Sequence, residues 1–148
     1  MSSEDFGILL NLAYGVFKDD LHAALAKAGY DDLGPSFGYV FRLLADQPRS
    51  LAEVAAQLGI TPQGALKIVD EMVARRYVER SAHPQDGRIK LLSLTARGRQ
   101  ALAAAHAFHL RFERELAASI GAGNAQAARA ALEHIAARAR EGALPRPA

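Results

Sequence analysis

The chain has 148 residues, half of them hydrophobic and 23% charged, which suits one ordinary domain, and its many alanines favour helix. It contains no cysteine, so disulfides, thiolate metal ligands and cysteine redox sensing are excluded. No basic-then-apolar stretch opens the sequence and no apolar run reaches about 18 residues. We therefore expect a cytoplasmic protein with no membrane partner.

Helical periodicity dominates the first third of the chain. Apolar residues recur at steps of three and four from Phe6 to Leu25, which predicts an amphipathic helix ending near Gly29. Residues 31–35 should form a loop. A second helix is expected over residues 36–45, with an apolar face formed by Phe37, Val40, Phe41 and Leu44.

A third helix has clear start and stop signals. Residues 47–49 should break the second helix, and Ser50 can cap a third that runs to about Leu58. Gly59 suits the turn that follows, because it adopts a conformation that residues with a Cβ disfavour. The small side chain of Ala55 would let the next helix approach closely.

The fourth helix follows this turn directly. Thr61 is a good N-cap, and Pro62 takes the first helical position, where its missing N–H costs nothing. The helix should run to about Arg76. Its outward residues near the N-terminal end would be Gln63, Gly64 and Lys67.

A short β-hairpin is expected next. Residues 78–81 and 89–94 are predicted to be its strands, and the turn-rich segment 83–87 between them contains Asp-Gly. Arg88 and Lys90 place positive charge at the tip. A basic two-stranded ribbon after a helical hairpin is the layout of a winged helix-turn-helix, a DNA-binding module.

Two helices complete the chain. Thr95 can cap a long helix that extends to about Ile120, and residues 121–123 should break it. A final helix is expected to about Glu141, with a frayed tail at 144–148. The long helix would measure about 38 Å at 1.5 Å per residue, more than the small winged domain can cover.

The fourth helix carries the expected base contacts. Gln63 can pair with adenine, and Lys67 can reach a phosphate or a guanine edge. The N–H groups beside Thr61 suit a phosphate, and Gly64 would allow close approach of the backbone. The alternative is an ordinary solvated polar face. The full set of expected DNA contacts is Ser50, Thr61, Pro62, Gln63, Gly64, Lys67, Arg80, Arg88 and Lys90.

In the wing, Arg88 is either a minor-groove probe or an unengaged loop arginine. Asp86 is an anion and should not meet DNA. We expect it to stabilise the wing by orienting Arg88 or by pairing with Arg80, which is itself a candidate phosphate contact.

Charge is distributed unevenly along the chain. Residues 61–99 hold eight basic and four acidic residues, a net of +4. The remainder holds ten basic and twelve acidic residues, a net of −2, which accounts for the overall +2. Positive charge therefore gathers where DNA would bind, although a mixed surface alone would also account for it.

These motifs resemble the MarR (multiple antibiotic resistance regulator) family, and the resemblance covers nearly the whole chain. It implies a homodimeric transcription regulator, often a repressor released by a small molecule. Gly64 departs from the family, which usually has a larger residue there, and the missing cysteines argue against its peroxide-sensing branch. The segments that carry the resemblance are Ser50-Leu51-Ala52-Glu53-Val54-Ala55, Leu58-Gly59-Ile60-Thr61, Leu66 to Asp70, Tyr77-Val78-Glu79-Arg80, Asp86-Gly87-Arg88 and Leu92-Ser93-Leu94-Thr95-Ala96-Arg97-Gly98.

Three apolar helix faces need a partner, and the simplest solution is a second copy of the chain. A symmetric dimer would read two half-sites of a palindromic operator about 34 Å apart. The alternative is a monomeric helical bundle. We expect an N-terminal dimerisation segment at 1–35, the winged helix-turn-helix at 36–95, C-terminal dimerisation helices at 96–143 and the tail at 144–148.

The resemblance also implies an effector pocket between the dimerisation helices and the winged domain. A small aromatic anion would suit aromatic walls with histidine as the polar group, although these rings could equally fill the core. His106 and His109, with Glu113 four further on, could bind a metal, but packed or solvated histidines are the simpler reading and we expect no metal or other cofactor. The candidate pocket residues are Tyr14, His22, Phe37, Phe41, His106 and Phe108.

Two other classes of function fit the sequence less well. An enzyme is disfavoured because the sequence has no Gly-rich phosphate loop, nucleophile elbow or metal signature. A winged helix used only for protein contacts would need an apolar or acidic recognition face, whereas Gln63 and Lys67 are expected there. Salt-dependent binding to duplex DNA distinguishes that module from a regulator.

Overall fold

The computed structural model describes residues 3–140, and the expected end of the last helix at Glu141 and the tail at 144–148 lie outside them. The mainly helical fold with a small hairpin wing is confirmed. In chain order the elements are α1 (Phe6–Lys27), α2 (Phe37–Leu44), β1 (Arg49–Ser50), α3 (Leu51–Leu58), α4 (Pro62–Ala74), β2 (Val78–Ala82), β3 (Lys90–Leu94), α5 (Ala96–Ile120) and α6 (Ala122–Arg140).

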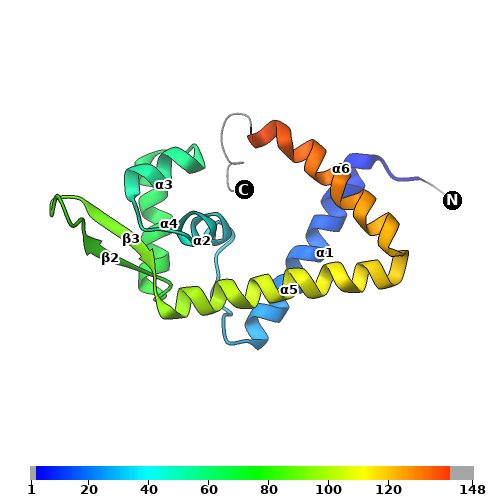
Figure 1. The fold of residues 1–148 in the computed structure, drawn as a ribbon, viewed down its shortest axis with the longest axis horizontal. Helices are drawn as coiled ribbons and strands as arrows, with labels where there is room; N and C mark the ends of the chain where they lie inside the picture. The colour runs from blue at the N-terminus through cyan, green and yellow to red at the C-terminus, as the bar shows by residue number, and fades with distance from the viewer. Residues whose placement is uncertain (1–2, 141–148) are drawn as a thin grey trace.

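The elements form two parts joined by α5 (Figure 1). Helices α2, α3 and α4 pack with the sheet at one end, and the β2–β3 hairpin projects from that part. Helix α5 runs away from it, and both α1 and α6 contact α5. This layout places the winged part at one end of a long helix and leaves α1 and α6 around the other.

The helix starts follow the caps that the sequence contains. The Ser50 hydroxyl accepts the Glu53 N–H at 3.2 Å, and the Glu53 carboxylate accepts the Ser50 N–H at 3.3 Å, a complete capping box. The hydroxyls of Thr61 and Thr95 each accept the N–H three residues on, both at 3.0 Å. Gly59 ends α3 with φ of 65°, as its position in the turn predicts.

The sheet has three strands rather than the two expected. Strand β1 pairs with β3 so that Arg49 lies opposite Leu92, and β2 pairs with the other edge of β3, where Arg80 lies opposite the same residue. A two-residue strand has no hydrophobic alternation to reveal it. Its pairing depends on the fold, where the Arg49 guanidinium also donates to the Leu43 carbonyl at 2.7 Å.

The junctions at the ends of α4 and α5 also differ from expectation. Helix α4 ends at Ala74, and Arg76 takes a left-handed conformation with φ of 67°. The amides of Arg76 and Tyr77 bond back to the carbonyls of Val73 and Met72, so this residue fills the place usually held by glycine. Only Gly121, with φ of 89°, separates α5 from α6, although a break over three residues was predicted.

The hydrophobic core lies in the winged part. Its largest fully buried side chains come from α2, α3, α4, the turn after α4 and the sheet, so these segments stabilise one another by removing apolar surface from water. They are Tyr77, Leu44, Leu58, Met72, Leu92, Val40, Val54, Val69 and Val78.

Helix α1 has a different environment. Only Leu25 is buried on it, although the sequence predicts a full inward face. The exposed apolar side chains of α1 are Phe6, Ile8, Leu9, Leu10, Leu12, Tyr14 and Val16.

Within residues 3–140, no helix combines the length and apolar character needed to cross a bilayer.

Gly98 tests the packing where α5 begins. A Cβ at this position would lie 2.2 Å from the Tyr77 carbonyl oxygen, so Gly98→Ala must displace backbone. We expect it to lower the free energy of unfolding by roughly 1–3 kcal/mol or more, measured by urea denaturation at a fixed protein concentration. Gly123→Ala is the matched control, because a Cβ there meets nothing within 4 Å and alanine favours helix. Equal stability of the two variants would contradict this packing.

Candidate nucleic-acid interface

Helix α4 presents its polar residues on one exposed face. Gln63 and Lys67 are exposed with Asp70, whereas Ala65 and Val69 are buried on the opposite side. The helix N-terminus, with its cap and proline, is exposed next to this face. The structure therefore brings the expected recognition residues together on one surface.

The surroundings of Gly64 leave little space for a side chain. A Cβ there would lie 3.3 Å from the Thr61 Oγ1 atom and 3.8 Å from the Ile60 Cδ1 atom. The Thr61 hydroxyl already accepts the Gly64 N–H at 3.0 Å. A Cβ at this position would therefore make a tight contact with the cap, which glycine avoids.

The wing holds its arginine in a defined position. The Arg88 side chain is 91% exposed, yet its backbone N–H and its Nε each donate to the Asp86 Oδ1 atom at 3.1 Å. These hydrogen bonds hold the pKa of Asp86 below its usual value, so its carboxylate remains charged at neutral pH. The guanidinium is thus positioned at the wing tip and open to solvent.

Arg80 does not pair with Asp86, the second possibility that the sequence left open. It forms an ion pair with Asp70 on α4 instead. The reason is register: Arg80 lies opposite Leu92 in the middle of the hairpin, whereas Asp86 is in the turn at its tip. The pair connects the recognition face to the wing and partly neutralises the Arg80 charge.

The remaining expected contacts differ in availability. The Ser50 hydroxyl is engaged in the capping box and also donates to the Glu53 carboxylate at 3.1 Å. Lys90 is exposed at the start of β3, opposite Ala82. Across residues 3–140, neither Lys67 nor Lys90 forms an ion pair, so both ammonium groups are free to meet phosphates.

A cavity of about 610 Å³, here called the central cavity, lies where α1, α2 and α5 meet. It is lined by these helices, by the loop between α1 and α2 and by the end of α6. Five of the six candidate pocket residues line it, namely Tyr14, His22, Phe37, Phe41 and His106.

The central cavity is apolar with a positive bias. Lys18 and Arg42 are its charged side chains, and no carboxylate lines it among the described residues. His109 also faces it and stacks on Phe17, with ring centroids 5.2 Å apart. Burial lowers the pKa of His109, and the neighbouring Arg42 adds to this, so the imidazole is neutral at neutral pH.

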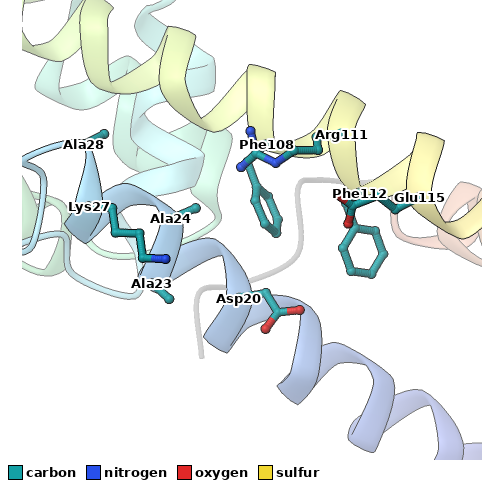
Figure 2. Close-up of a pocket in the computed structure, with 9 residues that line it drawn as sticks. All are labelled: Asp20, Ala23, Ala24, Lys27, Ala28, Phe108, Arg111, Phe112 and Glu115. Carbon is teal, nitrogen blue, oxygen red and sulfur yellow. The ribbon is translucent and has the colours of Figure 1, made fainter.

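Phe108, the sixth candidate pocket residue, does not line the central cavity. It lines a separate groove of about 540 Å³ between α1 and α5, where Figure 2 shows its ring with Phe112 pointing toward α1. Residues two apart on a helix point in nearly opposite directions, so Phe108 cannot share the face of His106. Charges of both signs surround this groove, including Asp20 and Lys27.

The histidine pair does not assemble a metal site. Within residues 3–140, no three histidine or carboxylate side chains are grouped so that they could hold a metal ion. Glu113, the third ligand considered, forms an ion pair with Arg129 of α6 instead.

Comparison with known proteins agrees with this geometry. Residues 32–89 match the sequence profile of the MarR family. The structure of the transcriptional repressor CouR bound to a 23-mer DNA duplex is 30% identical, covers 89% of this chain and 92% of its own, and superposes with a TM-score of 0.69. The chain belongs to the MarR family. It is therefore a DNA-binding transcriptional regulator with a winged-helix fold, and family membership assigns it to regulation rather than catalysis.

Solved structures with lower sequence identity share the fold. RV1404 from Mycobacterium tuberculosis is 21% identical with a TM-score of 0.72, over 91% of this chain and 94% of that one. A mutant of MarR from E. coli is 18% identical with a TM-score of 0.66, over 91% and 98%. No curated protein sequence matches the chain.

Several of the residues that line the central cavity were not predicted from the sequence. Arg42 and His109 were not predicted to line a pocket, and neither was Lys18. The signal was present in α5, where Leu102, Ala105, His106 and His109 follow one helical face. Reading that face as a stripe would have included His109 and excluded Phe108.

The interface makes a direct prediction about two cations. If Arg88 enters a minor groove, Arg88→Ala should weaken binding to a selected operator by roughly 1–3 kcal/mol, most strongly with AT-rich flanks. Lys67→Ala should weaken all duplexes alike and reduce the salt slope by about one unit.

Fluorescence anisotropy over a range of salt concentrations measures both effects. Arg114→Ala, an exposed position on α5, is the charge-matched control and should leave affinity unchanged. Unchanged affinity in both interface variants, with the fold intact by circular dichroism, would rule out this DNA face.

Proposed function

We propose that the chain is a homodimeric repressor that binds a palindromic operator and is released by a small aromatic anion. The observation that carries this is the exposed face of α4, with Gln63 and Lys67, together with a wing arginine that Asp86 positions. The 30%-identical relative is described as a transcriptional repressor bound to DNA, which supports the same role here.

The face suits a duplex in a particular orientation. The N-terminal end of α4 would enter the major groove, where Gln63 can read a base edge. Lys67 and the free amides near Thr61 would contact phosphates. The wing would then follow the backbone and direct Arg88 toward the adjacent minor groove.

Dimerisation is supported by apolar surface that one copy leaves exposed. Seven large apolar side chains of α1 are in solvent, and Leu110, Ile120, Leu132 and Ile135 of α5 and α6 are exposed as well. So many large apolar side chains exposed on the same few helices are typical of an interaction site. Because these helices lie away from the DNA face, a second copy can cover them while both recognition helices remain open.

The dimer is tested together with its operator. Sedimentation at micromolar concentration should show twice the 15.9 kDa chain mass, and selection from random duplexes should enrich a palindrome with half-sites about 34 Å apart. A species of 15.9 kDa alone would contradict the dimer. Failure to enrich any duplex, with binding that does not depend on salt, would favour a protein-interaction module.

The central cavity is the proposed effector site. Its aromatic walls suit a flat apolar ligand, and Arg42 and Lys18 favour a negative group in the absence of any lining carboxylate among residues 3–140. The two recognition helices of the dimer would have one spacing that fits DNA and another that does not. A ligand can shift the equilibrium between these two arrangements only by as much as its affinities for them differ.

Salicylate is the first compound to test. We expect millimolar salicylate to release the operator, and Arg42→Gln to raise the required concentration roughly tenfold, because a hydrogen bond to a charged group is lost. Lys27→Gln removes the same charge from the groove of Figure 2 and is the matched control. If no salicylate-like acid releases DNA at millimolar concentration, the effector proposal fails and DNA binding stands.

A further inference from the structure

A polar cluster lies between the recognition face and the central cavity and belongs to neither. The Asp32 carboxylate accepts hydrogen bonds from the Tyr77 hydroxyl and from Arg97 Nη2, the latter at 3.3 Å. Arg97 Nη2 also donates to the Tyr77 hydroxyl at 2.9 Å. Three segments of the chain meet here: the α1–α2 loop, the turn after α4 and the first turn of α5.

The tyrosine of this cluster is protected from solvent, whereas its ion pair is partly exposed. Tyr77 is fully buried, and Arg97 stacks over its ring at 4.6 Å from the centroid. Burial and the hydrogen bond to Asp32 raise the pKa of Tyr77 to about 12, so its hydroxyl keeps the proton that it donates. Asp32 and Arg97 are about one-third exposed, which leaves the ion pair room to break and reform.

The same cluster holds the C-terminal end of the recognition helix. Arg75, the C-cap of α4, donates from its guanidinium to the Asp32 carbonyl oxygen at 2.6 Å. In return, the Arg75 carbonyl oxygen accepts from Arg97 Nε at 3.3 Å. The end of α4 is therefore bonded to both the α1–α2 loop and α5.

The loop that carries Asp32 also forms a wall of the central cavity. Leu33, Gly34 and Pro35 line the cavity directly after it. Gly34 lies so close to Phe37 that a Cβ would be 2.8 Å from the Phe37 Cε1 atom. The Arg75 guanidinium lies over the same Phe37 ring, 5.4 Å from its centroid.

We propose that the Asp32–Tyr77–Arg97 cluster transmits occupancy of the central cavity to the C-terminal end of α4. Asp32 and Arg97 are then positioning residues, because they contact neither DNA nor effector. A ligand that displaces the loop or Phe37 moves Asp32, and with it the hydrogen bonds that orient Arg75 and the first turn of α5. This inference rests on the proposed effector site, but its test uses no effector.

Gly34→Ala imitates an occupied cavity by pressing on Phe37. We expect it to weaken binding to the selected operator about tenfold in the wild-type background and less than twofold in Arg97→Gln, a non-additivity typical of coupled residues. Gly38→Ala is the matched control, because Gly38 lines the same cavity but a Cβ there meets nothing within 4 Å. In an Arg97→Lys background, which keeps the charge, Gly34→Ala should weaken operator binding more than it does in Arg97→Gln.

Equal losses in both backgrounds, or no loss in Gly34→Ala alone, overturn the proposal. If Gly34→Ala proves too unstable to assay, amide exchange in Arg97→Gln decides. The Tyr30 amide is bonded to Leu25 on the loop side, and the Tyr77 amide is bonded to Met72 on the recognition side. Faster exchange at both amides supports the link, and a change confined to one of them overturns it. A wild-type chain that selects no operator identifies failure of the proposed function itself.

Discussion

The position of Tyr77 is the constraint on which the rest of the structure depends. Its amide closes the end of α4, and its carbonyl oxygen accepts the Thr95 N–H at 3.1 Å and leaves space only for glycine at position 98. Its ring packs against Phe37 and Phe41 in the core. Because Tyr77 contacts the recognition helix, the wing and α5 at once, the orientation of any one of these elements depends on the other two.

Local signals in the sequence predicted most of the fold. Ser50, Thr61 and Thr95 cap helices where expected, because a cap depends on residues only three positions apart. Strand β1 and the left-handed Arg76 could not be predicted in this way. Both depend on tertiary contacts: the first on pairing with β3, the second on the demands of the turn that places Tyr77.

The same distinction applies to the candidate site. The Asp86–Arg88 contact spans two residues and was among the sequence-based possibilities, whereas Asp70–Arg80 spans ten and Asp32–Arg97 spans sixty-five. Pattern analysis names residues of the right type, but the pairing of distant charges requires the folded chain. Phe108 shows a further limit of such patterns, since a correctly predicted helix still leaves open which pocket each of its faces lines.

The length of α5 has a mechanical consequence. At 1.5 Å per residue, about 18 Å separates Ala96, where the winged part is attached, from Phe108, where α1 packs. A helix of this kind acts as a lever, and a tilt of roughly 10° about Phe108 displaces its near end by about 3 Å, close to the rise of one base pair. A tilt of this size would therefore move the winged part by about one base-pair step along a bound duplex.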